Sequence, residues 1–313
     1  MTQKLERDFV SANLAAVEAL LAQATDEDDL GAMSLEAHRD ELRAELAKMK
    51  ATPETTASAT LFFSGRPVID NRGIEAEFGA DAAKSYQDIV TRQFAYRQTG
   101  RLGQRGNIPG RDQSKLYITH VVRGSFGFRL EELAPQTPLL ASALKEAMDE
   151  TARVMLAFAE PDEEVSLASV TNLDGRVLDA VRGFFDLMRR SDAVFRLVSG
   201  ELDRPFDRAA VQRAAERASI TTLRETEETM DGELTGVLPE RRLFEYRTTG
   251  LGTISGVLGA DLADDEVARL NLDWVGKPSR ATVRTRQAVR GERTSRPGYT
   301  LLAIGSGADA VPR

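Results

Sequence analysis

The stretch ETMDGELTGVLPERRLFEYRTTGLGTISGVLGADL, residues 228–262, decides the C-terminal part of the fold. It holds three short strand-like runs separated by turns rich in Gly, Pro and Glu-Arg. A short helix over 262–272 follows, and two more strand-like runs occupy 281–289 and 298–305. Five short strands and one small helix predict a small β-barrel over residues 228–304, either SH3-like or OB-like.

A row of arginines marks the fourth of these strands, within SRATVRTRQAVRGERTSR (279–296). Successive side chains of a strand point to opposite faces, so Arg284, Arg286 and Arg290 are expected to share one face. Arg280 begins the row. The planar fork of arginine suits phosphate, and small barrels present such faces to nucleic acid. The row is therefore the first candidate for binding an anion or nucleic acid.

The sequence leaves a second interpretation of this row open. Carboxylates on neighbouring strands, such as Glu240 and Glu245, could neutralise the arginines and leave an ordinary solvated sheet face. Base stacking would need aromatic side chains among the arginines. The only candidates are Trp274, Phe244, Tyr246 and Tyr299.

Upstream of the barrel, the pattern predicts a mixed α+β domain with long helices over residues 58–219. Strands are expected at 59–69 and 193–200, and helices at 81–97, 174–191 and 206–219. Thr137 and Pro138 resemble an N-cap and first-turn proline of a further helix. Its buried stripe would include Leu140, Leu144 and Met148.

Residues 116–133, LYITHVVRGSFGFRLEEL, contain one of the two histidines of the chain. A hairpin turning at residues 123–124 would pair Val121 with Phe126 and Thr119 with Phe128, with His120 opposite Gly127. One unbroken strand would instead place His120 in the core, but it would be unusually long. The hairpin is favoured.

The first fifty residues predict a helical hairpin. Val10, Leu14, Val17 and Leu21 follow a helical period, and an acidic turn separates them from a second helix that Ser34 is expected to cap. Each helix has one narrow apolar stripe, so residues 1–50 are expected to pack on the body, a protein partner or a second copy. The overall class is α+β, ending in a disordered tail at 305–313.

The amino-acid composition excludes several classes of protein. The 313 residues are 42% apolar and carry a net charge of −8, which excludes a uniformly basic nucleic-acid binder but permits a local basic face. Residues 58–130 hold eleven basic and six acidic side chains, a net +5. The absence of cysteine excludes disulfides and thiolate chemistry. Without an apolar run long enough for a bilayer or an apolar leader, no membrane association is expected and a cytoplasmic location is the default.

The sequence contains no complete motif for a catalytic nucleophile or a metal site. Ser125 follows His120, but Arg-Gly-Ser-Phe-Gly lacks the glycine that begins a nucleophile elbow. Two histidines 82 positions apart form no His-x-x-x-His metal motif, and no cofactor or metal is expected. The loop over 97–115 spaces Arg101, Arg105 and Arg111 among glycines, whose backbone amides could converge on an anion.

These observations favour a non-enzymatic binding or adaptor protein with a basic barrel face for nucleic acid or an acidic partner. The predicted contact residues are Arg280, Arg284, Arg286, Arg290, Arg101, Arg105 and Arg111. One alternative is a hydrolase or phosphate-handling enzyme with a site assembled around His120, Asp70 and the 97–115 loop. A structural subunit of a larger bacterial complex is the other.

Overall fold

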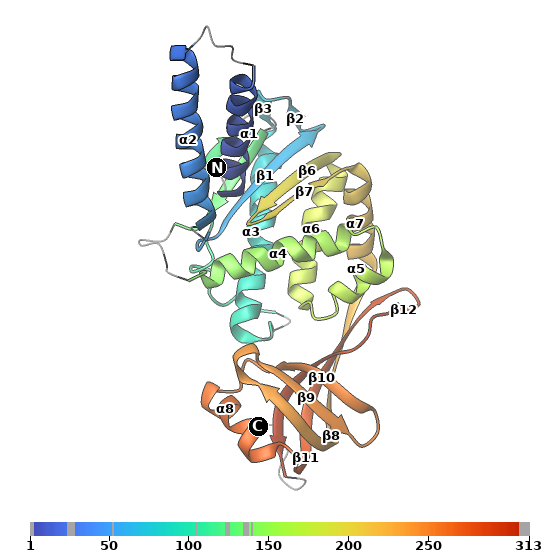
Figure 1. Ribbon diagram of the computed structural model, residues 1–313. Coiled ribbons are helices and arrows are strands. Elements are labelled where there is room, and N and C mark those ends of the chain that lie inside the picture. Colours follow the sequence, from blue (N-terminus) through green and yellow to red (C-terminus); the bar gives the residue numbers. More distant parts are fainter. Residues whose placement is uncertain are drawn as a thin grey trace. The chain divides into compact units, whose positions relative to one another are not determined.

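The computed structural model describes residues 3–23, 29–51, 53–103, 105–122, 126–133, 138 and 140–306 (Figure 1). The predicted α+β class is confirmed: an N-terminal helix pair, central sheets with helices and a C-terminal closed β-barrel. The chain forms two compact units. The first comprises Met1–Val90, Asp112–Ala152 and Arg190–Arg208, and the second Thr91–Arg111, Arg153–Arg189 and Ala209–Arg313. The boundaries predicted at residues 50, 219 and 228 remain predictions.

An antiparallel five-stranded sheet organises the first unit, in the order β4-β5-β1-β6-β7. The strands are β1 (Ser58–Gly65), β4 (Tyr117–Val122), β5 (Phe126–Glu131), β6 (Ala193–Ser199) and β7 (Leu202–Phe206). Six successive residues of β1, from Ser58 to Phe63, are buried, as expected for the central strand. Two short strands, β2 (Val68–Ile69) and β3 (Gly73–Ile74), pair beside it.

The hairpin predicted within 116–133 is present as β4 and β5, but its predicted register is wrong. Val121 pairs with Phe128, and His120 lies opposite Arg129. The pair nearest the turn, Val122 with Gly127, already departs from the predicted register by two residues. A separate irregularity between Ile118 and His120 leaves one extra residue in β4, as a β-bulge does. The predicted turn residues, 123–124, lie outside the described residues.

The N-terminal helical hairpin is confirmed as α1 (Gln3–Leu21) and α2 (Asp29–Ala51). Val10, Val17 and Leu42 form its buried seam. The second helix begins at Asp29, so the expectation that Ser34 caps it is wrong; Ser34 lies within α2. Acidic residues favour the first turn of a helix, which explains the earlier start.

Two other helix starts differ from prediction. α3 (Ala76–Thr99) begins five residues before the helix predicted over 81–97. α4 (Ala143–Ala159) begins after Leu140, which is 81% exposed and is not part of the buried stripe. Of the predicted cap, Pro138 lies outside α4 and Thr137 outside the described residues.

Three further helices, α5 (Glu163–Ser169), α6 (Gly175–Arg190) and α7 (Arg208–Ile220), precede the barrel. α6 confirms the helix predicted over 174–191, and its buried face includes Val177, Val181, Phe184, Phe185 and Met188. Among the described residues, none of the helices combines the length and hydropathy that a bilayer span requires.

The barrel closes in the order β8-β9-β10-β13-β11, with β11 pairing back to β8. Its elements are β8 (Thr221–Leu238), η1 (Pro239–Arg241), β9 (Leu243–Thr248), β10 (Gly252–Leu258), α8 (Asp264–Trp274), β11 (Pro278–Arg290), β12 (Arg293–Thr294) and β13 (Gly298–Gly305). Counting the five barrel strands along the chain, the order is 1-2-3-5-4-1, with the third parallel to the fifth and a helix after the third. This is the OB-fold arrangement rather than that of an SH3 barrel.

β8 begins at Thr221, seven residues earlier than predicted, and this extension positions the arginine row. Residues 221–227 of β8 pair with β11 alone, so the two strands continue past the barrel as a ribbon. β12 folds back onto the end of β11 (Figure 1).

Candidate anion-binding surface of the second unit

The arginine row of β11 lies against carboxylates of the neighbouring strand. Arg284 donates from Nη2 to Glu227 at 2.9 Å, and Arg286 donates from Nε to Glu225 at 2.8 Å. The strand register explains these pairs, because Glu227 and Glu225 lie directly opposite the two arginines. Only 8% and 6% of the two arginine side chains is exposed. These guanidinium groups are internal ion-pair partners.

Arg286 has a second partner in α3. Its Nη1 donates to the hydroxyl of Tyr96, and the guanidinium lies over the tyrosine ring, 5.3 Å from the ring centroid. Burial raises the pKa of Tyr96, although the charge and hydrogen bond of Arg286 oppose that shift. The phenol therefore stays neutral and acts as a hydrogen-bond acceptor for Arg286.

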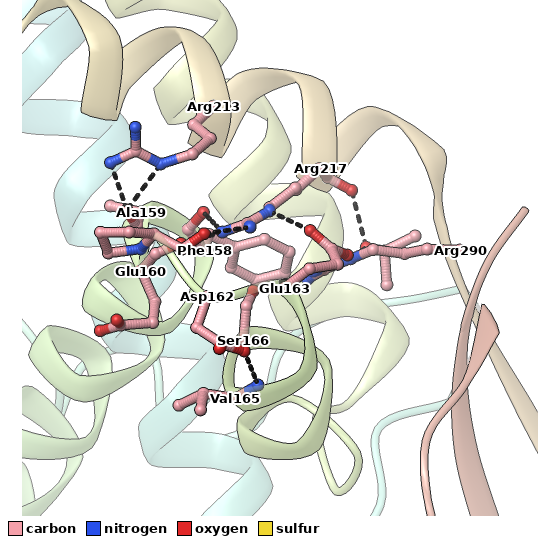
Figure 2. A network of polar contacts seen from close by, with 12 residues as sticks. Phe158, Ala159, Glu160, Asp162, Glu163, Val165, Ser166, Arg213, Arg217 and Arg290 are labelled. Carbon is pink, nitrogen blue, oxygen red and sulfur yellow. Dashed lines mark hydrogen bonds and ion pairs between the residues drawn. The ribbon is translucent and has the colours of Figure 1, made fainter.

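Arg290 belongs to a network that reaches α5 and α7 (Figure 2). It donates to Glu163 at 3.0 Å, to Ser166 at 2.8 Å and to the hydroxyl of Thr221 at 2.6 Å. Arg217 of α7 pairs with the same Glu163 at 2.6 Å. Burial alone would raise the pKa of Glu163, but hydrogen bonds and charge from the two arginines hold it below its ordinary value. The Glu163 carboxylate thus forms ion pairs with two buried arginines, Arg217 and Arg290.

Arg280, the first member of the row, is the most exposed. It forms a two-pronged ion pair with Asp231 of β8, at 2.7 and 3.1 Å. This hydrogen bond lowers the pKa of Asp231 and raises that of Arg280. Water and salt screen the pair, so a ligand could compete for Arg280 more readily than for the buried members.

The structure thus pairs the row with carboxylates of the chain, as the second interpretation of the sequence allows. The neutralising groups are Asp231, Glu225, Glu227 and Glu163, not the suggested Glu240 and Glu245. Part of this pairing has a signal in the sequence RETEE (224–228), where two glutamates two residues apart share a strand face. Glu163 has no such signal, because its acidic run resembles a solvated helix end.

The glycine-rich loop contributes one arginine to the same cluster. Arg101 approaches Glu225 at 3.6 Å and Glu227 at 3.5 Å and is 57% exposed. Arg105 is exposed and has no ion pair with a described residue, and Arg111 is also exposed. Arg101 and Arg286, singled out in separate parts of the sequence, thus share Glu225.

Other exposed arginines of the barrel lie in its connecting loops. Arg241 ends η1, between the first and second barrel strands, whereas Arg293 and Arg296 lie between the fourth and fifth. None of the three forms an ion pair with a residue that the structure describes. The sequence did not single them out, because only the strand row showed a period.

The aromatic side chains considered for base stacking pack into the barrel. Phe244 and Tyr246 are buried, and Trp274 and Tyr299 are partly buried against the same core. Tyr246 donates its hydroxyl hydrogen to backbone carbonyls inside the barrel, including that of Ser279 at 2.7 Å. These four residues therefore offer no open stacking platform.

His120 lies in the first unit, on the outermost strand of its sheet, and is exposed. The arginines Arg101, Arg105 and Arg111 belong to the second unit. Ser125 lies outside the described residues. Within the described parts of the chain, no three His, Asp or Glu side chains gather in a way that could hold a metal ion.

Comparison of the chain with protein-family models, with curated proteins and with solved structures finds no match.

Proposed function

We propose that this chain is a non-enzymatic binding protein whose barrel contacts nucleic acid through Arg241, Arg293 and Arg296. One observation carries the proposal: these exposed arginines without ion-pair partners among the described residues lie in the two loops that OB-folds use. The loops between strands 1 and 2 and between strands 4 and 5 flank the nucleic-acid face of that fold. The buried arginines of β11 stabilise the ribbon and are not assigned contacts with nucleic acid.

The contacts are expected to involve phosphates rather than bases. The four aromatic residues near the arginine row are directed into the barrel core, so stacking contributes little. Arginine donates two parallel hydrogen bonds to a phosphate group. Binding should consequently be tolerant of base sequence and strongly dependent on salt.

The test is fluorescence anisotropy with labelled single-stranded DNA and RNA oligonucleotides of mixed sequence, over a series of salt concentrations. The variant R241E/R293E/R296E should bind at least about tenfold more weakly, a loss of roughly 1.4 kcal/mol or more. The slope of log affinity against log salt should fall by about 0.7 for each phosphate contact removed.

The matched control is R72E/K84E/R204E, which changes net charge equally at exposed positions of the first unit. Its affinity should stay close to that of the unmodified chain. Equal losses in both variants would indicate a non-specific charge effect and contradict the proposal. Retention of an acidic protein in place of the oligonucleotides would favour the acidic-partner alternative.

A further inference from the structure

A second candidate site in the same unit is a groove between the start of α6 and the first residues of β8. It encloses about 540 Å³, within the range of small-molecule sites. Leu102, Leu178 and Leu223 give it an apolar part, and Arg101 and Arg224 line it as well. The groove therefore combines apolar surface with cationic groups.

The cations of the groove outnumber its carboxylates. Asp174 accepts hydrogen bonds from the backbone amides of Arg176 and Leu102, and so caps α6 and fixes the loop. Among the described residues, the Arg176 guanidinium donates only to the backbone carbonyls of Gly103 and Gly106, which do not offset its charge. Arg224 has no ion pair with a described residue. An excess of positive charge remains.

Two further features favour an anion. Arg286 lines the groove with 94% of its side chain buried, and its Nη2 has no hydrogen-bond partner among the described residues. α6 is sixteen residues long, and its first turn opens onto the groove, so its dipole adds positive potential there. A buried donor without an acceptor destabilises the fold, and a ligand oxyanion that reached Nη2 would supply the missing acceptor.

We propose that this groove binds a small organic phosphate, a phosphate monoester that carries an apolar group. The phosphate lies between Arg101, Arg224 and Arg286, near the start of α6. Fork-shaped donors from several arginines suit a tetrahedral dianion. The apolar group packs on Leu102, Leu178 and Leu223. The site is separate from the loop arginines of the proposed nucleic-acid surface.

Isothermal titration calorimetry of the full chain with phenyl phosphate tests the site, with inorganic phosphate and phenol as comparison ligands. Phenyl phosphate should bind with one-to-one stoichiometry and at least about tenfold more tightly than either. R101Q/R224Q changes two exposed side chains and should weaken binding at least about tenfold. The control R72Q/R204Q should bind as the unmodified chain does, and circular dichroism checks that both variants fold.

Three results would overturn the assignment: no heat of binding at millimolar phenyl phosphate, unchanged affinity in R101Q/R224Q, or equal affinity for inorganic phosphate. R241E/R293E/R296E separates the two proposals. It should retain phenyl phosphate binding even where it loses the oligonucleotide. Displacement of a bound oligonucleotide by phenyl phosphate would assign the groove to the nucleic-acid surface and overturn it as a separate site.

Discussion

At the scale of single residues, Glu163 is the shared anion of two buried arginines, Arg290 of β11 and Arg217 of α7. Arg290 is 2% exposed and Arg217 8%, and both depend on this one carboxylate. Glu163→Gln would leave two buried cations without an anion, and should cost about 3 kcal/mol in unfolding free energy. Urea denaturation followed by circular dichroism measures the loss.

Arg290→Met is the matched comparison at the same network. It removes one of two cations and leaves Glu163 paired with Arg217, so it should cost about 1 kcal/mol, mainly from lost hydrogen bonds to Ser166 and Thr221. The Arg290 guanidinium also lies over the Phe158 ring, 5.3 Å from the ring centroid. If Arg290→Met is as damaging as Glu163→Gln, hydrogen bonding or this ring contact dominates the network, and the charge argument fails.

At the scale of elements, closure of the barrel depends on close approach between β10 and β13. A Cβ built on Gly256 would lie 2.1 Å from the carbonyl oxygen of Tyr299, where the two strands pair in parallel. Gly256→Val should therefore separate the strands and cost about 3 kcal/mol or more. Trp274 packs against the barrel core and is the only tryptophan, so a red-shifted emission and a lower urea midpoint report the loss.

Gly250→Ala is the control, because a Cβ at that position meets nothing within 4 Å. Its emission maximum and midpoint should stay close to those of the unmodified chain. Equal effects of the two substitutions would mean that glycine content, rather than the β10–β13 contact, limits the barrel.

Elements were predictable where a local period specifies them. The α6 stripe and the strand alternation of the barrel depend on residues a few positions apart. The first residues of helices were less predictable. Ser34 and Thr137 resemble cap residues, but the two helices concerned begin at Asp29 and Ala143. The register of β4 against β5, which places His120 opposite Arg129, has no residue pattern of its own.

The partners of the arginine row were not predictable from spacing alone. Glu225 and Glu227 precede Arg286 and Arg284 by about sixty residues, and Glu163 precedes Arg290 by more than a hundred. Only strand pairing and the position of α5 bring these groups together. A row of arginines in sequence therefore predicts a shared face, but not whether that face meets solvent.

At the scale of the whole molecule, ion pairs in both units link stability to acid pH. Hydrogen bonds to Arg196 and Arg7 lower the pKa of Asp203 and Glu201 in the first unit. In the second, burial raises the pKa of Glu163, but its arginine partners outweigh burial and lower it. Glu54 differs, because burial raises its pKa.

A carboxyl whose folded-state pKa is lowered stabilises the fold above its unfolded value, and this contribution is lost as pH falls through the folded value. Melting temperature should therefore be nearly constant above about pH 5 and fall steeply below about pH 4. Glu163→Gln should start from a lower plateau and show a shallower acid decline, because its neutral amide has no proton to gain. Protonation of Glu54 offsets a small part of the fall. Differential scanning calorimetry between pH 3 and 7 measures both curves, and parallel curves would refute a role for Glu163 in the acid response.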